Sequence, residues 1–453
     1  MISSIVFVIL LCATAIIFIR RLREIRFNIN LGRELDLSGN FSERFKIMAR
    51  VALGQSKLVT KPVAFFMHVL IYVGFIIINI EIIEILLDGI FGTHRVLEGI
   101  LGSSVYYVFI GVFEILALMV LLACVVFLIR RNIGNIRRFS GAEMTKWPTS
   151  DANIILVSEI LLMLAFLTMN AADSVLMTAP TELLIANGHE HYSGFDFGGW
   201  FWISAYLTGF MPNNVDTLYI IERGCWWFHI VGVFAFSIYV LYSKHFHIFI
   251  AFPNTFYSRL KPSGEIANLE AVKKEVEMMM DPAADPYAAP PADALAPQRF
   301  GAKDVEDLSW KQLMDAYSCT ECGRCTSECP ANQTGKLLSP RKIMMDTRDR
   351  LEEVGQMRRK EGAEASDVRS LLGDFITKEE LWACTTCNAC VEACPVNINP
   401  LSIIVDLRRF LVMEESAAPS ELNTMFTNIE NNGAPWQFAQ ADRGNWTDEL
   451  KDK

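Results

Sequence analysis

The sequence predicts a mostly α-helical protein in two parts, a five-helix transmembrane bundle followed by a small, mostly helical domain. Three observations lead to this fold class. Five windows are apolar over the roughly 20 residues that a helix needs to cross a membrane. After Phe252 no long apolar run remains in the 453-residue chain. The tail that follows contains most of the 11 cysteines, gathered in two tight groups.

The composition agrees with several membrane spans plus a soluble part, because 52% of the residues are hydrophobic and the mean hydropathy is positive. We expect residues 1–252 to form the membrane domain, 253–303 an amphipathic helix and a linker, and 304–453 the tail domain. The five predicted spans are Ile2–Ile19, Pro62–Leu87, Val105–Ile129, Asn153–Thr178 and Cys225–Ile250.

The charges of the loops predict the orientation. Basic residues follow the first and third spans, at Arg20, Arg21, Arg23, Arg26, Arg33, Arg44, Arg130, Arg131, Arg137 and Arg138. The loop after the fourth span is acidic and has one basic residue, Arg223. Because loops rich in Lys and Arg stay in the cytoplasm, we expect a multi-pass protein of the cytoplasmic (inner) membrane, with its N-terminus outside and the tail domain in the cytoplasm. The first span lacks a basic leader and a cleavage site and is expected to remain as an anchor.

The segments outside the membrane have distinct compositions. Lys261–Met280 is amphipathic, and the Pro- and Ala-rich stretch Asp281–Gln298 is typical of an extended linker. Helices are expected over Asp304–Tyr317, Pro340–Leu381 and Pro400–Glu415, with an irregular end from residue 417. The net charge of −10 arises mostly from the tail and the outer loops. No basic patch with interleaved aromatic residues indicates binding to nucleic acid.

The two cysteine groups, CTECGRCTSECP from Cys319 and CTTCNACVEACP from Cys384, share the spacing C-x2-C-x2-C-x3-C-P. Bacterial ferredoxins hold two [4Fe–4S] clusters with this spacing, and the fourth cysteine of each group binds the other cluster. The predicted ligand sets are Cys319, Cys322, Cys325 with Cys394, and Cys384, Cys387, Cys390 with Cys329. Structural zinc is the alternative, but its cysteine pairs usually come two by two with a long gap. Cys12, Cys124 and Cys225 lie in the spans and are interpreted as small core residues.

Histidines on membrane helices point to a second kind of cofactor, since polar groups there are costly and usually functional. His229 and His247 lie 18 residues apart and would share one face of the fifth span. His68 near the cytoplasmic end of the second span matches the depth of His247, because these spans run antiparallel. Two facing imidazoles are a common way to hold a b-type haem. We therefore predict His68 and His247 as axial ligands, with His245 beside Lys244 in the headgroup region or next to a haem propionate.

Five spans with histidines on the second and fifth resemble the nitrate reductase gamma subunit, a quinol-oxidising di-haem membrane anchor. The pattern WWFH…YSKHFH…PN-x-FY and the segment Phe300–Ala331 are similar to a subfamily in which this cytochrome b bundle is fused to a dicluster iron–sulfur domain. That subfamily includes heterodisulfide-reductase-related subunits and electron-transfer-flavoprotein:menaquinone oxidoreductases. The resemblance implies an electron-transfer subunit that links a cytoplasmic donor, two [4Fe–4S] clusters, haem b and menaquinone.

The chain departs from that family at two places. Where the di-haem pattern has another histidine on the second span, this chain has Ile78 and Asn79, so His229 lacks a partner for a second haem. His94, His189 or His191 would have to replace it from the outer loops. Related long chains continue into a domain with paired Cys-Cys-Gly motifs, whereas this one ends after Trp446. We therefore expect a separate iron–sulfur subunit to carry that domain, with an electron-transfer flavoprotein or another soluble protein as donor.

Carboxylates on the spans suggest proton chemistry at a quinone. Glu81 and Glu84 lie near the outer end of the second span and are interpreted as interfacial. Glu114 is deeper and is predicted to carry protons to or from a quinone, or else to be a neutral carboxyl bonded to a neighbouring helix. Lys57, Lys61 and Lys244 are expected to face a haem propionate or a quinone headgroup. An alternative function is a membrane-anchored redox sensor or docking scaffold without quinone turnover; the sequence offers no inverted repeat that would favour a transporter.

Overall fold

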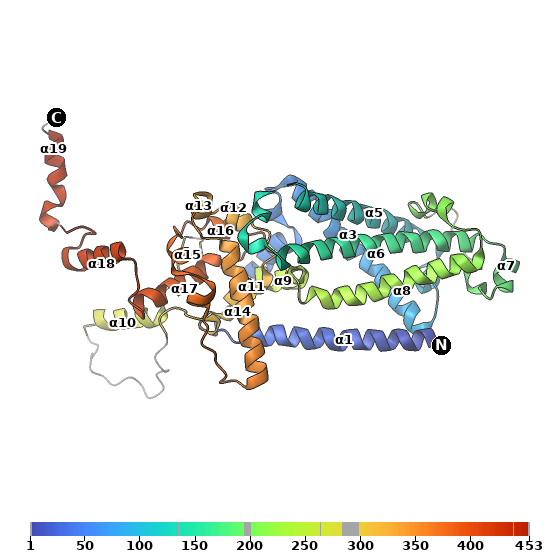
Figure 1. Ribbon diagram of the computed structural model, residues 1–453, viewed down its shortest axis with the longest axis horizontal. Helices are drawn as coiled ribbons and strands as arrows, with labels where there is room; N and C mark the ends of the chain where they lie inside the picture. The colour runs from blue at the N-terminus through green and yellow to red at the C-terminus, as the bar shows by residue number, and fades with distance from the viewer. Residues whose placement is uncertain are drawn as a thin grey trace.

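The computed structural model describes residues 2–134, 136–193, 201–262, 264–282, 299–437 and 439–451. The described part of the chain is built from helices and contains no β-strand. Five long apolar helices lie side by side, and shorter helices of the tail gather at one end of this bundle (Figure 1). The fold class is confirmed to that extent: the protein is mostly helical and has five helices able to span a membrane.

The five long helices are α1 Ile2–Ile29, α3 Pro62–Phe91, α5 Ser103–Asn132, α6 Trp147–Met177 and α8 Val215–Val240. Along the bundle α3 packs on α5, α5 on α6 and α6 on α8, while α1 contacts both α3 and α8. The shorter helices are α2 Phe41–Met48, α4 Val96–Leu101, α7 Thr181–Ala186, α9 His247–Phe256, α10 Glu270–Met280, α11 Trp310–Ser318, α12 Arg324–Ser327, α13 Pro330–Gln333, α14 Pro340–Glu361, α15 Lys378–Trp382, α16 Ala389–Ala393, α17 Pro400–Met413, α18 Ser420–Asn432 and α19 Asp448–Lys451.

The fifth span differs from its prediction. We expected one helix over Cys225–Ile250, but α8 starts ten residues earlier and ends at Val240. A 3₁₀ turn, η8 (Lys244–Phe246), then precedes α9. The interruption is stable because the released N–H groups find other acceptors: the Ser243 side chain accepts from His245 N–H at 3.1 Å, and Asp151 accepts from Lys244 N–H at 3.2 Å. His229 and His247 therefore do not share the face of one continuous helix.

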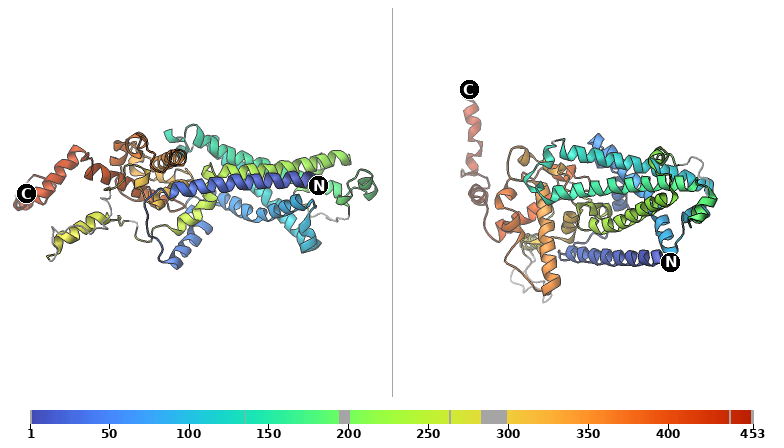
Figure 2. Two further views of the ribbon diagram at one scale, coloured as in Figure 1. Left: turned by 90° about the horizontal axis from the view of Figure 1, so that it is seen from below. Right: turned by 45° about the vertical axis from the view of Figure 1, so that its right-hand side comes forward.

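Within the predicted tail domain, residues 304–413 pack directly on the bundle, and the name tail domain is used for these residues from here on. One apolar core contains Ile25 of α1 and Leu241 after α8 together with Leu313, Ile343 and Leu407 of the tail domain. We call this end of the bundle the domain end and the opposite one the far end. The N-terminus lies at the far end, and the C-terminal helices extend beyond the tail domain (Figure 2).

The contact between α1 and the tail domain depends on one glycine. Nδ2 of the fully buried Asn28 donates to the hydroxyl of Tyr317 at 2.8 Å. Gly355 of α14 lies against it, and a Cβ at that position would come within 2.0 Å of the Asn28 side-chain oxygen. Only glycine allows the two helices to approach this closely.

Two expectations outside the bundle have different outcomes. The end after residue 417 is not irregular, because α18, a 3₁₀ segment (Gln440–Thr447) and α19 occupy most of it. The sequence did not predict these helices because the segment is polar and lacks the apolar face that marks a packed helix; α18 buries none of its residues. Most of the predicted Pro- and Ala-rich linker, residues 283–298, lies outside the described residues.

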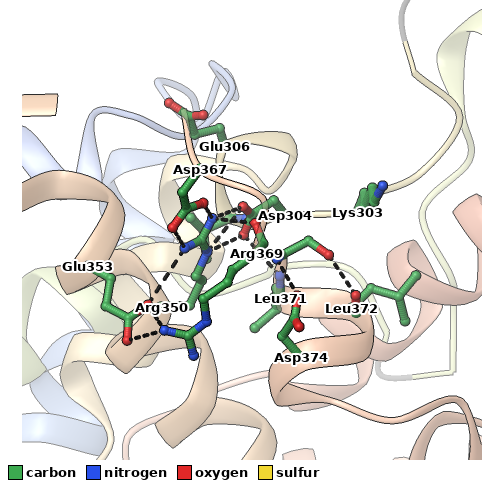
Figure 3. Close-up of polar contacts among 12 residues, drawn as sticks. Lys303, Asp304, Glu306, Arg350, Glu353, Asp367, Arg369, Leu371, Leu372 and Asp374 are labelled. Carbon is green, nitrogen blue, oxygen red and sulfur yellow. Dashed lines mark hydrogen bonds and ion pairs between the residues drawn. The ribbon is translucent and has the colours of Figure 1, made fainter. Parts of the chain in front are cut away.

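Arg350 of α14 holds the entry to the tail domain in place (Figure 3). Its guanidinium is 2% exposed and donates to Asp304 at 2.6 Å, to Asp367 at 2.7 Å and to the main-chain oxygen of Arg369 at 2.7 Å. The Arg350 charge, acting through its hydrogen bond, lowers the pKa of Asp367. Asp304 also caps the 3₁₀ turn η9 (Val305–Asp307). The Arg350 side chain therefore joins α14 to the start of η9 and to the loop that contains Asp367.

We predict that Arg350→Lys lowers the free energy of unfolding of the tail domain by about 2 kcal/mol, because an ammonium cannot reproduce the planar fork that bonds the partly exposed Asp304 and Asp367. Thermal unfolding of the full chain, followed by circular dichroism, measures the change. Arg369→Lys is the matched control, since Arg369 pairs at the surface with Glu353, and it should cost less than about 1 kcal/mol. Equal losses in the two variants would contradict the assigned role.

Candidate metal centres

Four cysteines from both motifs surround one cavity in the tail domain. Cys329 of the first motif and Cys384, Cys387 and Cys390 of the second line it together with Leu338, Pro340, Leu401 and Ile404. Cys329 stands in front of α13, whose first residue is Pro330. Proline at this position ends the preceding segment and starts a new helix, which turns the Cys329 side chain away from its own motif.

The other four cysteines also lie close to one another. Cys319 caps the end of α11 and Cys394 the end of α16. Burial, followed by the charges of Cys322 and Cys319, raises the pKa of the Cys394 thiol to about 12. The pKa of Cys325 is raised by burial and then by Cys319, Cys322 and Cys394. Cys319, Cys322, Cys325 and Cys394 therefore lie near one another, and Cys390 of the other set also acts on Cys325.

The two cysteine loops have the same backbone shape. Glu321 and Thr386, two residues after the first cysteine of each motif, have φ of 54° and 57°, and Gly323 and Asn388, two residues later again, have φ of 70° and 61°. Left-handed residues at these positions give both loops the same curvature, and the second loop curves around the cavity. The thiol of Cys384 accepts from Thr386 N–H at 3.4 Å, the type of hydrogen bond that tunes cluster potentials.

The donor set fits a cluster better than a single ion. Among the described residues, no three or more His, Cys, Asp or Glu side chains are arranged around the position of one metal ion. A [4Fe–4S] cube instead takes a thiolate at each of four corners. The cavity lined by Cys329, Cys384, Cys387 and Cys390 provides that arrangement.

His68 and His247 face each other at the domain end. Their ring centroids are 6.4 Å apart and the ring planes are inclined by 42°. Nδ1 of His68 lies 3.0 Å from the Gln55 side-chain oxygen, and Nδ1 of His247 lies 3.1 Å from the Lys244 main-chain oxygen. An oxygen neighbour requires Nδ1 to carry the proton, which leaves Nε2 of both rings to bind a metal. Two imidazoles bound to one metal through Nε2, at about 2 Å each, have centroids about 6 Å apart.

The remaining predicted histidines occupy different places. The interruption after α8 turns His245 toward His247, with ring centroids 5.4 Å apart, rather than to the opposite face of a helix. His229 is buried, and its Nδ1 lies 3.0 Å from the Leu162 main-chain oxygen. His189 stacks on Tyr219 of α8 at the far end. Tyr219 lies ten residues before His229 on the same helix, which separates the two by about 15 Å along the helix axis.

The loops that hold His68 and His247 contact the cysteine loops. Lys244 pairs with Glu321, which lies between Cys319 and Cys322. In front of α3, Lys57 donates to the main-chain oxygen of Val391 at 3.5 Å, and Arg324 donates to the main-chain oxygen of Lys57 at 3.3 Å. The lysines that the sequence suggested for a propionate or quinone therefore contact the tail domain.

Lys61 follows the same pattern, because it lies 3.8 Å from Glu328. Sequence reasoning missed Gln55 and Glu321, whose roles become visible only when distant segments meet. The position of Glu321, inside the first cysteine motif, was the one available signal.

Glu114 is fully buried in the far half of the bundle. Its Oε1 accepts from Asn170 at 3.1 Å, and its Oε2 accepts from the main-chain N–H groups of Ile203 and Ser204 at 2.8 and 3.2 Å. These donors make Glu114 a fixed acceptor that holds the loop before α8. The sequence did not reveal Arg95, which is buried beside it and donates to Asn170.

Comparisons with known proteins agree with the cysteine geometry. The family described as "4Fe-4S dicluster domain" matches residues 318–398. The chain is 28% identical to the probable iron-sulfur-binding oxidoreductase FadF of Bacillus subtilis, over 99% of this chain and 61% of that protein. It is 29% identical to the EtfAB:quinone oxidoreductase of Syntrophomonas wolfei, over 88% of this chain and 53% of that protein.

A third relative is the probable membrane-anchored ferredoxin of Chromohalobacter salexigens, 34% identical over 35% of this chain and 25% of that protein. The chain spans roughly half to three-fifths of the length of the first two relatives. No solved structure matches it. The tail of this chain contains a 4Fe–4S dicluster domain, and the first two relatives are named as oxidoreductases.

The exchange of cysteines between motifs can be tested with Cys329→Ser. Because Cys329 lines the cavity of the second motif, we expect this variant to alter the same electron paramagnetic resonance signal as Cys384→Ser and to lose up to about four of roughly eight irons. Cys12→Ser, in α1, should keep both signals. If the spectrum of Cys329→Ser instead matches that of Cys319→Ser, the ligand sets are wrong.

Proposed function

We propose that this chain is the electron-transfer subunit of a membrane quinone oxidoreductase. In this proposal the eight motif cysteines hold two [4Fe–4S] clusters, and His68 and His247 hold one haem b at the domain end of the bundle. The clusters and haem supply one-electron chemistry, and a quinone is the membrane-soluble substrate. The observation that carries the proposal is the facing pair His68–His247 with both Nδ1 atoms fixed by oxygen acceptors.

The contribution of the chain itself is spacing. Lys244 offers its main-chain oxygen to His247 and its side chain to Glu321 in the first cysteine loop. Gln55, which holds His68, lies two residues before Lys57, which contacts the residue after Cys390. Each axial histidine is thus linked to a different cysteine loop by a few covalent and hydrogen bonds. This keeps the proposed redox centres close and their distance constant.

The proposed setting follows from the loops and the relatives. Basic residues of the loop after α5 gather at the domain end, where the main-chain oxygen of Arg138 accepts from Arg341 of the tail domain at 2.5 Å. This favours a cytoplasmic (inner) membrane protein with the iron–sulfur domain in the cytoplasm. The name of the Syntrophomonas relative supports EtfAB as electron donor and a quinone as acceptor; we propose menaquinone. Because further relatives are named as subunits C and D of heterodisulfide reductases, we also propose a separate iron–sulfur subunit with Cys-Cys-Gly motifs as a partner.

A pyridine haemochrome assay combined with an iron count on the purified full chain tests the proposal. We expect one haem b and about eight non-haem irons per chain. His68→Leu and His247→Leu should each lose the haem and keep the iron, because each removes one axial ligand. His189→Leu, at the far end, is the control and should keep both.

A second measurement separates electron transfer from a passive scaffold. A reduced quinone added to the wild-type protein should reduce the haem and clusters, and His68→Leu should lose this reaction. Absence of haem in the wild type would overturn the proposed electron-transfer path through His68 and His247. Haem that is present but not reduced by any quinol would leave a membrane-anchored redox sensor or docking scaffold as the better description. Two haems would mean that His229, with its free Nε2, binds the second.

A further inference from the structure

A buried polar network fills the far end of the bundle, away from the proposed redox centres. Arg95 is at its centre and is 6% exposed. It donates to Asp173 at 2.7 Å, to the hydroxyl of Tyr106 at 3.1 Å and to Asn170 at 3.0 Å. An ionised side chain inside a membrane domain is costly unless it is paired, and such residues usually mark a pathway for ions or protons.

The network contains more carboxyl groups than cations, and most of them have donors. Glu84 and Glu114 each accept from at least two groups, and Asp173 accepts from Arg95 through its Oδ2. Glu84, for instance, accepts from the main-chain N–H of Leu97 at 3.0 Å and from the Tyr106 hydroxyl at 2.8 Å. These donors stabilise the ionised form of the three side chains.

Glu81 differs from them. It is 2% exposed, and its buried Oε2 accepts no hydrogen bond from the described residues. It lies one turn before Glu84 on the buried face of α3. Three charged groups act on Glu81: Arg95 in the loop after α3, Glu84 on α3 itself and Glu114 on α5. A buried carboxylate without a donor is strongly disfavoured relative to its protonated form, so among these carboxyl groups the geometry favours a proton on Glu81.

A line of titratable groups leads from Arg95 to the surface. Oδ1 of Asp173 lies 3.3 Å from Nε2 of His94, and the His94 ring lies 6.1 Å from that of His191, which is exposed. Burial, followed by the charges of His94 and Arg223, lowers the pKa of His191. An imidazole with a lowered pKa is neutral at neutral pH and can accept a proton.

We propose that Glu81 is the proton-carrying carboxyl of a relay that opens to the surface through His94 and His191 at the far end. The inference rests on the proposed quinone function, because a quinol that gives up two electrons also releases two protons. The proton breaks its bond to the Glu81 carboxyl and is taken up by an imidazole nitrogen at the exit, and Arg95 faces the carboxylate that remains. Electrons and protons would then leave the bundle at opposite ends.

Redox-difference infrared spectroscopy of the purified full chain tests the relay. In the wild type we expect a protonated-carboxyl band in the oxidised protein that changes on reduction. Glu81→Gln should lose this band and Glu81→Asp should restore it at a shifted position. Glu182→Gln is the matched control, because Glu182 is an exposed carboxylate at the same end, and it should leave the band unchanged.

The route to the surface has its own readout. In D₂O the band shifts as the Glu81 carboxyl exchanges its proton, and His94→Gln should slow this exchange. An unchanged band in Glu81→Gln overturns the relay, and unchanged exchange in His94→Gln overturns its exit. If Glu81→Gln fails to fold, labelling of the wild type with a hydrophobic carbodiimide replaces it: modification of Glu81 supports the proposal and an unmodified Glu81 contradicts it. Haem and iron are counted on the same samples, so loss of the proposed function is recognised separately.

Discussion

The buried ion pair between Lys244 and Glu321 is the interaction on which the arrangement of the two parts depends. The two side chains are 9% and 3% exposed, and Arg348 of α14 pairs with the second oxygen of Glu321 at 2.9 Å. Burial by itself would raise the pKa of Glu321, but the charges of Arg348 and Lys244 hold it below its ordinary value. Because an unpaired charge at this depth costs several kcal/mol (about 3–5), the tail domain cannot slide along the bundle without a large loss of stability.

The same pair accounts for the interruption after α8. In an uninterrupted helix Lys244 and His247 would lie three residues apart and project on neighbouring parts of one face. With the turn at Ser243, the Lys244 ammonium reaches Glu321 and the main-chain oxygen of Pro148, while the His247 ring faces His68 on α3. The lost helical hydrogen bonds are replaced by those to Ser243 and Asp151. The turn therefore fixes the histidine pair and the docked domain together.

Local patterns in the sequence were sufficient for the five spans and for the grouping of the cysteines. Membrane helices depend on a continuous apolar run, and the cysteine sets depend on a short spacing that folds the same way in both motifs. The break at Ser243 could not be predicted, since the acceptor Asp151 lies 92 residues away and the segment stays apolar beyond it. The role of Arg95 could not be predicted either, because its side-chain partners Asp173, Asn170 and Tyr106 come from α6 and α5 and only the packed bundle brings them together.

The two ends of the bundle use polar residues in different ways. At the domain end Lys57, Lys61 and Lys244 each contact an acceptor in the tail domain. These lysines therefore hold the tail domain on the bundle, and its acceptors compensate their charges. At the far end both the cation, Arg95, and its acceptors belong to the bundle. The carboxyl groups there outnumber the single positive charge of Arg95. In a membrane no water compensates the excess, so the protein must keep at least one proton on the cluster. Glu84, Glu114 and Asp173 each accept from at least one donor, whereas no described residue donates to the buried Oε2 of Glu81; this difference favours Glu81 as the carboxyl that keeps the proton.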